Sequence, residues 1–191
     1  MPRFRDAATW IAPLLTIAAA LAVPVNQPPA PDWEPQIVMA RHVAGTAGPG
    51  GADPSVWRAL PPGIGSERGL QIKTILAKRA VCAKFPQITE ISGFRPDPMK
   101  WHPNGLAVDF AIPDYDTPAG KALGDRITEF VMANAERFSL EYVIWRRMYI
   151  PAKGKPKLMA DLGNDDANHY THVHVSTYGG GYPRGGEIYL G

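Results

Sequence analysis

The chain has 191 residues, 45% of them hydrophobic, which is enough for one domain with a buried core and too few for two large ones. Its 20 basic and 18 acidic residues give a net charge of +2. Neither sign forms long blocks, so no nucleic acid is expected as a partner. A single cysteine, Cys82, excludes an intramolecular disulfide framework.

The first 25 residues have the pattern of an export signal. Arg3 and Arg5 precede an apolar run at positions 7–25, which contains the small-residue sequence ALA near its end. We therefore expect an extracytoplasmic protein, either secreted or associated with the cell envelope. Residues 1–25 are then either a signal peptide that is removed or, because Pro24 follows the proposed cleavage position closely, an N-terminal membrane anchor.

Residues 26–65 are rich in Pro, Gly and Ala and show little periodicity. This composition predicts a flexible linker between the export signal and a folded domain. The domain is predicted to cover residues 66–191.

Helix and strand patterns follow each other within that domain. Apolar spacing over 66–85 predicts a first helix. A second helix is predicted from Thr117 to Phe138, with Thr117 as its N-cap and Pro118 at its first position. Strand patterns occupy 87–92, 106–112, 140–150 and 172–177. These elements predict an α+β fold, a mainly antiparallel sheet of about four strands with two helices.

Two of these strands carry polar residues on one face only. In LAVDFAI, alternation places Asp109 with Ala107 and Ala111, opposite the aliphatic residues. In HVHVST it places His172 and His174 opposite the valines. If the strands are neighbours on one core, Asp109 and both histidines converge on the open face, and His102 in the preceding loop can reach the same point.

A buried carboxylate must be neutralised by a proton, a paired cation or a metal. Imidazoles together with a carboxylate suit zinc, and three protein ligands with one open position are typical of a catalytic zinc site. The residue types therefore predict a zinc centre. A single histidine would more simply be a hydrogen-bonded residue without a catalytic role, but several histidines in and beside two patterned strands favour the metal.

The segments HPNGLAVDF and HVHV resemble the signature of the D-alanyl-D-alanine metallopeptidases, which share a fold with lysostaphin-type peptidases and the hedgehog domain. The resemblance covers roughly 87–176 and implies that the zinc ligands are His102, Asp109 and His174. It also implies that His172 is the general base or stabilises the tetrahedral intermediate. SGFRP is similar to the Ser-Gly-Tyr-Arg segment of the family, so Arg95 would hold a substrate oxygen.

This chain departs from part of that family. Members that trim dipeptides have a glutamate three residues before the last zinc histidine, where this chain has Thr171. The chain is therefore more similar to the His-x-His branch, which includes murein endopeptidases. His169 is similar to a further active-site histidine of penicillin-insensitive murein endopeptidases, although a loop histidine can also be incidental.

The resulting expectation is an exported, monomeric zinc hydrolase of peptidoglycan stem peptides, acting as a carboxypeptidase or a cross-link endopeptidase. Two alternatives stay open. One is a zinc-containing module that binds cell wall or signals without catalysis, and the other is an N-acetylmuramoyl amidase. The basic residues Arg146, Arg147, Lys153, Lys155 and Lys157 either attract carboxylates of an anionic wall polymer or form an exposed hairpin tip.

Overall fold

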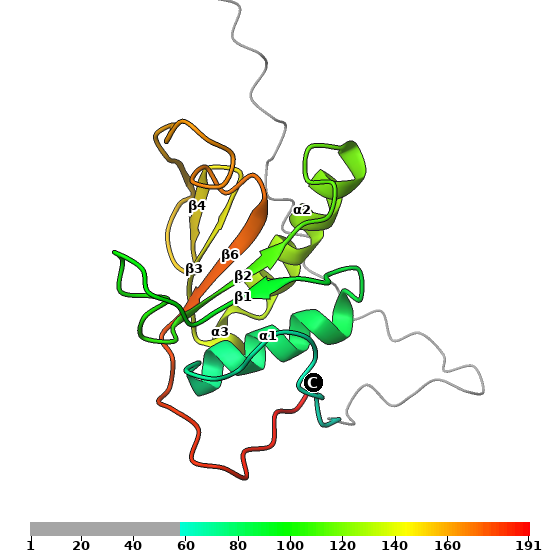
Figure 1. Ribbon diagram of the computed structural model, residues 1–191, viewed down its shortest axis with the longest axis vertical. Coiled ribbons are helices and arrows are strands. Elements are labelled where there is room, and N and C mark those ends of the chain that lie inside the picture. Colours follow the sequence, from blue (N-terminus) through cyan, green and yellow to red (C-terminus); the bar gives the residue numbers. More distant parts are fainter. Residues whose placement is uncertain (1–57) are drawn as a thin grey trace, which may run out of the picture. The chain divides into compact units, whose positions relative to one another are not determined.

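The computed structural model describes residues 58–191, so the predicted export signal and most of the predicted linker lie outside the described residues. Within these residues the chain forms three helices and a six-stranded sheet, and Figure 1 shows how they are arranged. The helices are α1 (Ile72–Lys84), α2 (Pro118–Ala133) and α3 (Ala135–Phe138). The strands are β1 (Ile91–Ser92), β2 (Ala107–Ala111), β3 (Leu140–Trp145), β4 (Met148–Pro151), β5 (Lys157–Leu158) and β6 (His172–Thr177).

All strand pairs of the sheet are antiparallel, in the order β1-β2-β6-β3-β4-β5. The sheet is open, with the short strands β1 and β5 at its edges. The predicted α+β class is thus confirmed. The sheet has more strands than the four expected, and the second helical pattern divides at Asn134 into α2 and the short α3.

The predicted long strand over 140–150 is wrong in one respect, because it is a hairpin of β3 and β4. Arg146 and Arg147 have φ angles of 50° and 65° and form its two-residue turn. Positive φ at both central positions is the geometry that joins two antiparallel strands tightly. Periodicity does not reveal such a turn when neither residue is Gly, Asn or Asp.

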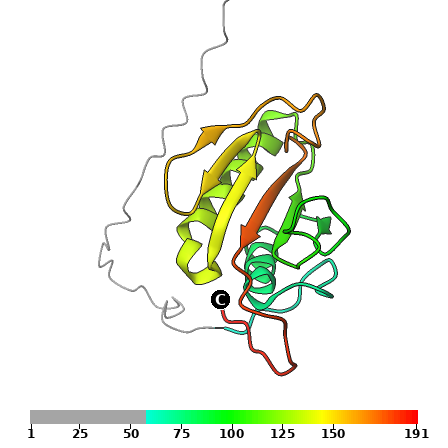
Figure 2. The same ribbon diagram turned by 90° about the vertical axis from the view of Figure 1, so that its left-hand side faces the viewer.

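The helices cover one face of the sheet, as Figure 2 shows. Alternate residues of the strands, among them Val108, Phe110, Val173 and Val175, point into the core between the sheet and the helices. The predicted start of α2 is confirmed, since Thr117 Oγ1 accepts a hydrogen bond of 3.1 Å from the Gly120 amide and Pro118 is the first helical residue. The other face of the sheet carries the polar residues.

The chain ends of the described region are tied to each other and to α1. Arg58 and Gly191 exchange two backbone hydrogen bonds of 3.0 and 2.7 Å. Arg58 precedes residue 66, the predicted start of the domain. The carbonyls of Gly181 and Gly179 accept from the Ile72 and Lys73 amides at 2.9 and 2.8 Å, so they cap α1 in place of a side chain. No helix within residues 58–191 is long and apolar enough to cross a membrane.

Candidate metal centre

The register between β2 and β6 brings the two patterned strands together as predicted. Asp109 lies directly opposite His174, and Ala111 lies opposite His172. Residues directly opposite each other point to the same side of a sheet. The carboxylate and both histidines therefore lie on the face opposite the helices, and the adjacent alanines leave room above them.

His102 reaches this face from the loop before β2. Gly105, with a φ of 66°, turns the chain back, and a Cβ there would lie 2.0 Å from the Gly69 carbonyl oxygen, so only glycine fits. His102 is buried, and its Nδ1 lies 2.8 Å from the Gly93 carbonyl. The carbonyl can only accept, whereas Arg95 Nη1, which lies 2.9 Å from the same Nδ1, can only donate, so the two groups compete for this nitrogen. When His102 donates to the Gly93 carbonyl, the ring proton lies on Nδ1. The lone pair then lies on Nε2.

His102 Nε2 is one of two buried side-chain nitrogen or oxygen atoms in residues 58–191 that lack a hydrogen-bond partner, the other being Thr128 Oγ1. It faces Asp109 Oδ2 at 3.3 Å. A lone pair beside a carboxylate oxygen is unfavourable unless a proton or a metal cation lies between them. The donation from Nδ1 to a carbonyl is the arrangement that usually orients a metal-binding histidine.

His174 completes the group from the middle of the sheet. Its Nδ1 lies 2.7 Å from Asp109 Oδ1, and its Nε2 lies 2.9 Å from the Ser176 hydroxyl. Because a hydroxyl can donate or accept, His174 can carry its proton on Nε2 and leave Nδ1 free for a metal. The Tyr142 ring stacks on the imidazole with centroids 5.7 Å apart and fixes its plane.

Asp109 is the common partner of these groups and is 6% exposed. Burial alone would raise the pKa of its carboxyl, but the adjacent His102 and His174 imidazoles and the charge that His172 can carry lower the pKa well below its ordinary value of 3.8. Arg95 Nη1 also donates to Asp109 Oδ2 at 2.8 Å. Asp109 is therefore ionised and available as a ligand.

These three residues can hold a metal ion. Ligand atoms of His102, Asp109 and His174 all lie within 4.8 Å of one another, and all three residues are buried. Two imidazoles and a carboxylate are the donor set of many catalytic zinc sites. The unpartnered His102 Nε2 is the observation that fits a cation best. The predicted ligand group is thus assembled by the fold, while the identity of the metal stays a prediction.

His172 lies beside this group without belonging to it. Its Nε2 lies 3.9 Å from Asp109 Oδ1. On the other side of the ring, Nδ1 lies 2.9 Å from Thr171 Oγ1, which donates to Asp166 Oδ1 at 3.0 Å. With the Thr171 proton committed to Asp166, the hydroxyl accepts from His172 Nδ1, and the lone pair on Nε2 faces the centre. Burial lowers the pKa of His172.

His169 is brought to the same place by the loop before β6. Its ring centroid lies 4.9 Å from that of His172 and 5.6 Å from that of His174. Its φ of 54° is unusual for a residue other than glycine. Burial, together with the positive charge of the two neighbouring histidines, lowers the pKa of His169 to about 4, so its ring is neutral at neutral pH.

Arg95 lies at the border between the metal group and solvent. Its side chain is 37% exposed, and besides Asp109 it contacts the Ser92 hydroxyl at 3.2 Å. The predicted substrate-binding arginine is therefore close to the centre. It also neutralises the carboxylate there, a contact that the sequence did not suggest.

An open cleft of about 390 Å³ lies over β1, β2 and β6 at this centre. Arg95, Asp109 and His172 line it, together with Glu90 and Asp166. The acidic rim and the single arginine make it polar. Of the three candidate ligands Asp109 lines this cleft, so a molecule bound there would contact Asp109 and His172.

Three residues of this environment were not singled out from the sequence as part of the site. Alternation in HVHVST puts Ser176 on the same face as the histidines but indicates no role for it, and Thr171 stands where part of the family has a glutamate. Tyr142 gave no signal beyond strand alternation. Each contacts the imidazole ring of a histidine: Thr171 contacts His172, and Ser176 and Tyr142 contact His174. Only the Tyr142 contact crosses a strand pair, that of β3 with β6.

Comparison with protein families matches residues 66–170 to the family described as VldE, C-terminal domain. The match covers more than half of the chain. The chain belongs to the family of VldE C-terminal domains. The matched region contains His102, Asp109, Arg95 and His169, and it ends just before β6 with His172 and His174. No curated protein and no solved structure matches the chain.

Proposed function

We propose that this member of the VldE C-terminal domain family is an exported zinc hydrolase that cleaves peptidoglycan stem peptides. One observation carries the proposal: the buried group of His102, Asp109 and His174 borders an open cleft that Asp109 and His172 line. The resemblance of HPNGLAVDF and HVHV to the D-alanyl-D-alanine metallopeptidases supports the choice of metal and substrate.

Three residues would hold the metal, His102 through Nε2, Asp109 through its carboxylate and His174 through Nδ1. A zinc ion in such a site supplies Lewis acidity, which lowers the pKa of water and polarises an amide carbonyl. Gly93 and Ser176 would keep the two imidazoles in the correct tautomer through their hydrogen bonds.

The remaining residues would move protons and hold the substrate. His172 Nε2 accepts the proton of the attacking water, because Thr171 and Asp166 hold the Nδ1 proton on the other side of the ring. The same proton then passes to the leaving amine. Arg95, which lines the cleft, donates to the carbonyl oxygen of the substrate as negative charge develops on it. His169 packs beside His172, with ring centroids 4.9 Å apart.

The experiment that tests this function compares His172→Ala with the unaltered protein. We expect purified protein to bind about one zinc ion per chain. The variant should keep that metal and lose hydrolysis of muropeptides by roughly 10²- to 10⁴-fold, the usual contribution of a general base. Metal content is measured by mass spectrometry, and products are measured by mass spectrometry of sacculus digests.

The digests also separate the alternatives from the sequence. New free amino groups within stem peptides support the peptidase, while release of intact peptides from the glycan would identify an amidase. Hydrolysis that continues after the metal is removed would refute the mechanism. Wall binding that is lost on chelation, with no cleavage product under any condition, would identify a non-catalytic zinc module.

A further inference from the structure

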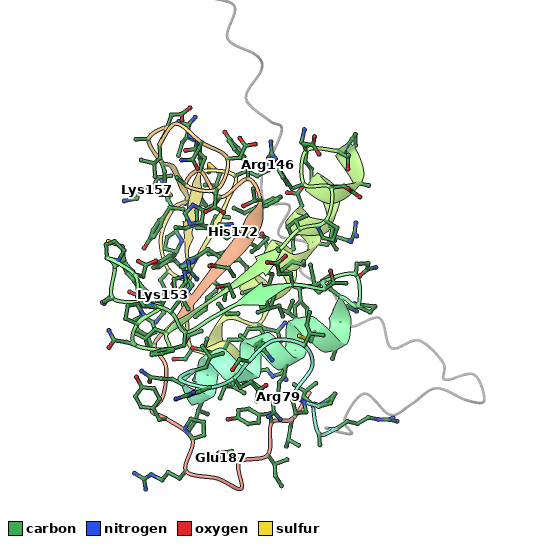
Figure 3. The ribbon with its side chains drawn as sticks, in the orientation of Figure 1. Arg79, Arg146, Lys153, Lys157, His172 and Glu187 are labelled. Atoms are coloured by element: carbon green, nitrogen blue, oxygen red, sulfur yellow. The ribbon has the colours of Figure 1, made fainter. Side chains whose placement is uncertain are left out.

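The two imidazoles of the candidate metal centre come from separate segments of the chain. His102 lies in the loop before β2, and His174 lies on β6, the strand between β2 and β3 on which Figure 3 labels His172. The His102 and His174 rings meet edge to face, with centroids 5.2 Å apart. A metal site tolerates little error in the spacing of its ligands, so a contact that fixes the loop on the sheet also fixes the site.

Trp101, the residue before His102, fastens this loop to the sheet. The Trp101 and Tyr142 rings lie edge to face, with centroids 5.3 Å apart and planes at 85°. Tyr142 is 4% exposed and stacks on His174, with centroids 5.7 Å apart. Ring contacts thus connect Trp101 through Tyr142 to His174, while the peptide bond connects Trp101 to the other imidazole ligand.

One hydrogen bond orients the Trp101 ring. Its Nε1 donates to Glu141 Oε2 at 2.8 Å, and a carboxylate acceptor makes this bond stronger than a bond to a neutral oxygen. The Trp101 carbonyl accepts from the Leu106 amide, also at 2.8 Å. The ring and the backbone of Trp101 are therefore held at the same time, by β3 and by the residue that precedes β2.

A β-bulge brings Glu141 to the indole. The register between β3 and β6 shifts between Leu140 and Tyr142, which leaves Glu141 as an extra residue of β3. Strict alternation would point the side chains of Glu141 and Tyr142 to opposite faces of the sheet. A bulge re-aims a side chain, and bulges are frequent beside active sites. Here both side chains contact Trp101.

We propose that Trp101 and Glu141 are positioning residues, which set the spacing of His102 and His174 and thereby the affinity of the centre for its metal. The inference rests on the metal-binding part of the proposed function and does not depend on which reaction follows. Neither Trp101 nor Glu141 lines the cleft over β1, β2 and β6. Their effect is therefore on the metal and not on substrate contacts.

The test measures the Kd for zinc on the full chain, by competition with a chelator. Glu141→Ala and Trp101→Phe each remove the hydrogen bond and should raise this Kd by about tenfold, the lower end of the effect of losing a partner behind a metal ligand. Glu141→Gln keeps a side-chain oxygen that accepts from the indole, so its Kd should stay within about threefold of that of the unaltered protein. In cobalt-loaded protein, the visible absorption bands that report ligand geometry should shift in the first two variants.

Asp125→Ala is the matched control. The Trp145 indole donates to Asp125 Oδ1 at 2.8 Å, a bond of the same kind and length. This bond joins β3 to α2, and Trp145 belongs to the core on the helix side of the sheet. Asp125→Ala should therefore lower the Tm and leave the Kd for zinc and the cobalt bands unchanged.

Each outcome decides for or against the inference. A lower Tm with an unchanged Kd in Glu141→Ala and Trp101→Phe would overturn it, because these residues would then only stabilise the fold. An equal rise of the Kd in Asp125→Ala would also overturn it, since affinity would then follow stability in general.

The same measurements separate this inference from the proposed hydrolase. Cleavage of muropeptides by the unaltered protein, with no change of the Kd in either variant, would keep the hydrolase and overturn the inference. A Kd that responds as expected, in a protein that cleaves no muropeptide, would keep the inference and refute the hydrolase. An unaltered protein that binds neither zinc nor cobalt would overturn both.

Discussion

Removing the charge of Asp109 should abolish metal binding, because one carboxylate contacts every other residue of the centre. Its oxygens lie 2.7 Å from His174 Nδ1, 2.8 Å from Arg95 Nη1 and 3.3 Å from His102 Nε2. Asp109→Asn keeps the shape of the side chain and removes its charge. Loss of a partner behind a metal ligand already lowers affinity by roughly 10- to 100-fold. We expect the loss of this ligand to lower zinc affinity by more than about 100-fold.

The same substitution should lower the free energy of unfolding of the metal-free domain. Breaking a buried ion pair costs about 3–5 kcal/mol. The Asp109 side chain is 8% exposed but that of Arg95 is 37% exposed, so solvent compensates part of the loss. We expect about 1–2 kcal/mol, which corresponds to a fall in Tm of about 4–8 °C for a domain of this size.

Thermal unfolding with and without zinc measures both effects. At a free zinc concentration of about 100 times Kd, binding stabilises the native state by about 2.7 kcal/mol, so the Tm of the unaltered protein should rise by about 10 °C. Asp109→Asn should show no rise. Asp116→Asn, an exposed aspartate outside the cleft, is the matched control and should respond like the unaltered protein. An unchanged zinc affinity in Asp109→Asn would refute the reasoning.

Two further predictions concern residues that hold others in place. Thr171→Val removes the hydroxyl that accepts from His172 Nδ1, so kcat should fall by about tenfold while zinc content stays constant. Thr171→Ser keeps the hydroxyl and should restore kcat. An unchanged kcat in the valine variant would contradict this role. Burial raises the pKa of Glu67, but hydrogen bonds and charge from Arg79 and Lys78 lower it by more. The pKa of Glu67 therefore lies below its ordinary value of 4.5. Its ionised form therefore stabilises the fold above that pH, and the stabilisation is lost as pH falls through the folded pKa. Glu67→Gln should unfold at lower urea than the unaltered protein at pH 7 but not near pH 3, and an equal difference at both pH values would speak against the ion pairs.

Much of the fold could be predicted because burial leaves a periodic pattern in the chain. The start of α2 follows from Thr117 and Pro118, since the side-chain oxygen and the fixed φ of proline act locally. The hairpin of β3 and β4 could not be predicted, because its turn is made by two arginines in positive φ. That turn also places Arg146 and Arg147 at the opposite end of β4 from Lys153, so these residues do not form one basic tip.

For the site, the sequence by itself determined which residues are chemically able to form a metal centre. Strand alternation put Asp109 and His174 on the faces away from the core, because side chains of a strand point to opposite sides in turn. The tertiary structure decided that these faces meet, since only the pairing of β2 with β6 fixes Asp109 opposite His174. It also decided the contacts behind two of the histidines: the Gly93 carbonyl lies behind His102, and the Thr171 hydroxyl lies behind His172. These contacts join residues on separate segments or depend on how the loops fold, so no local pattern encodes them.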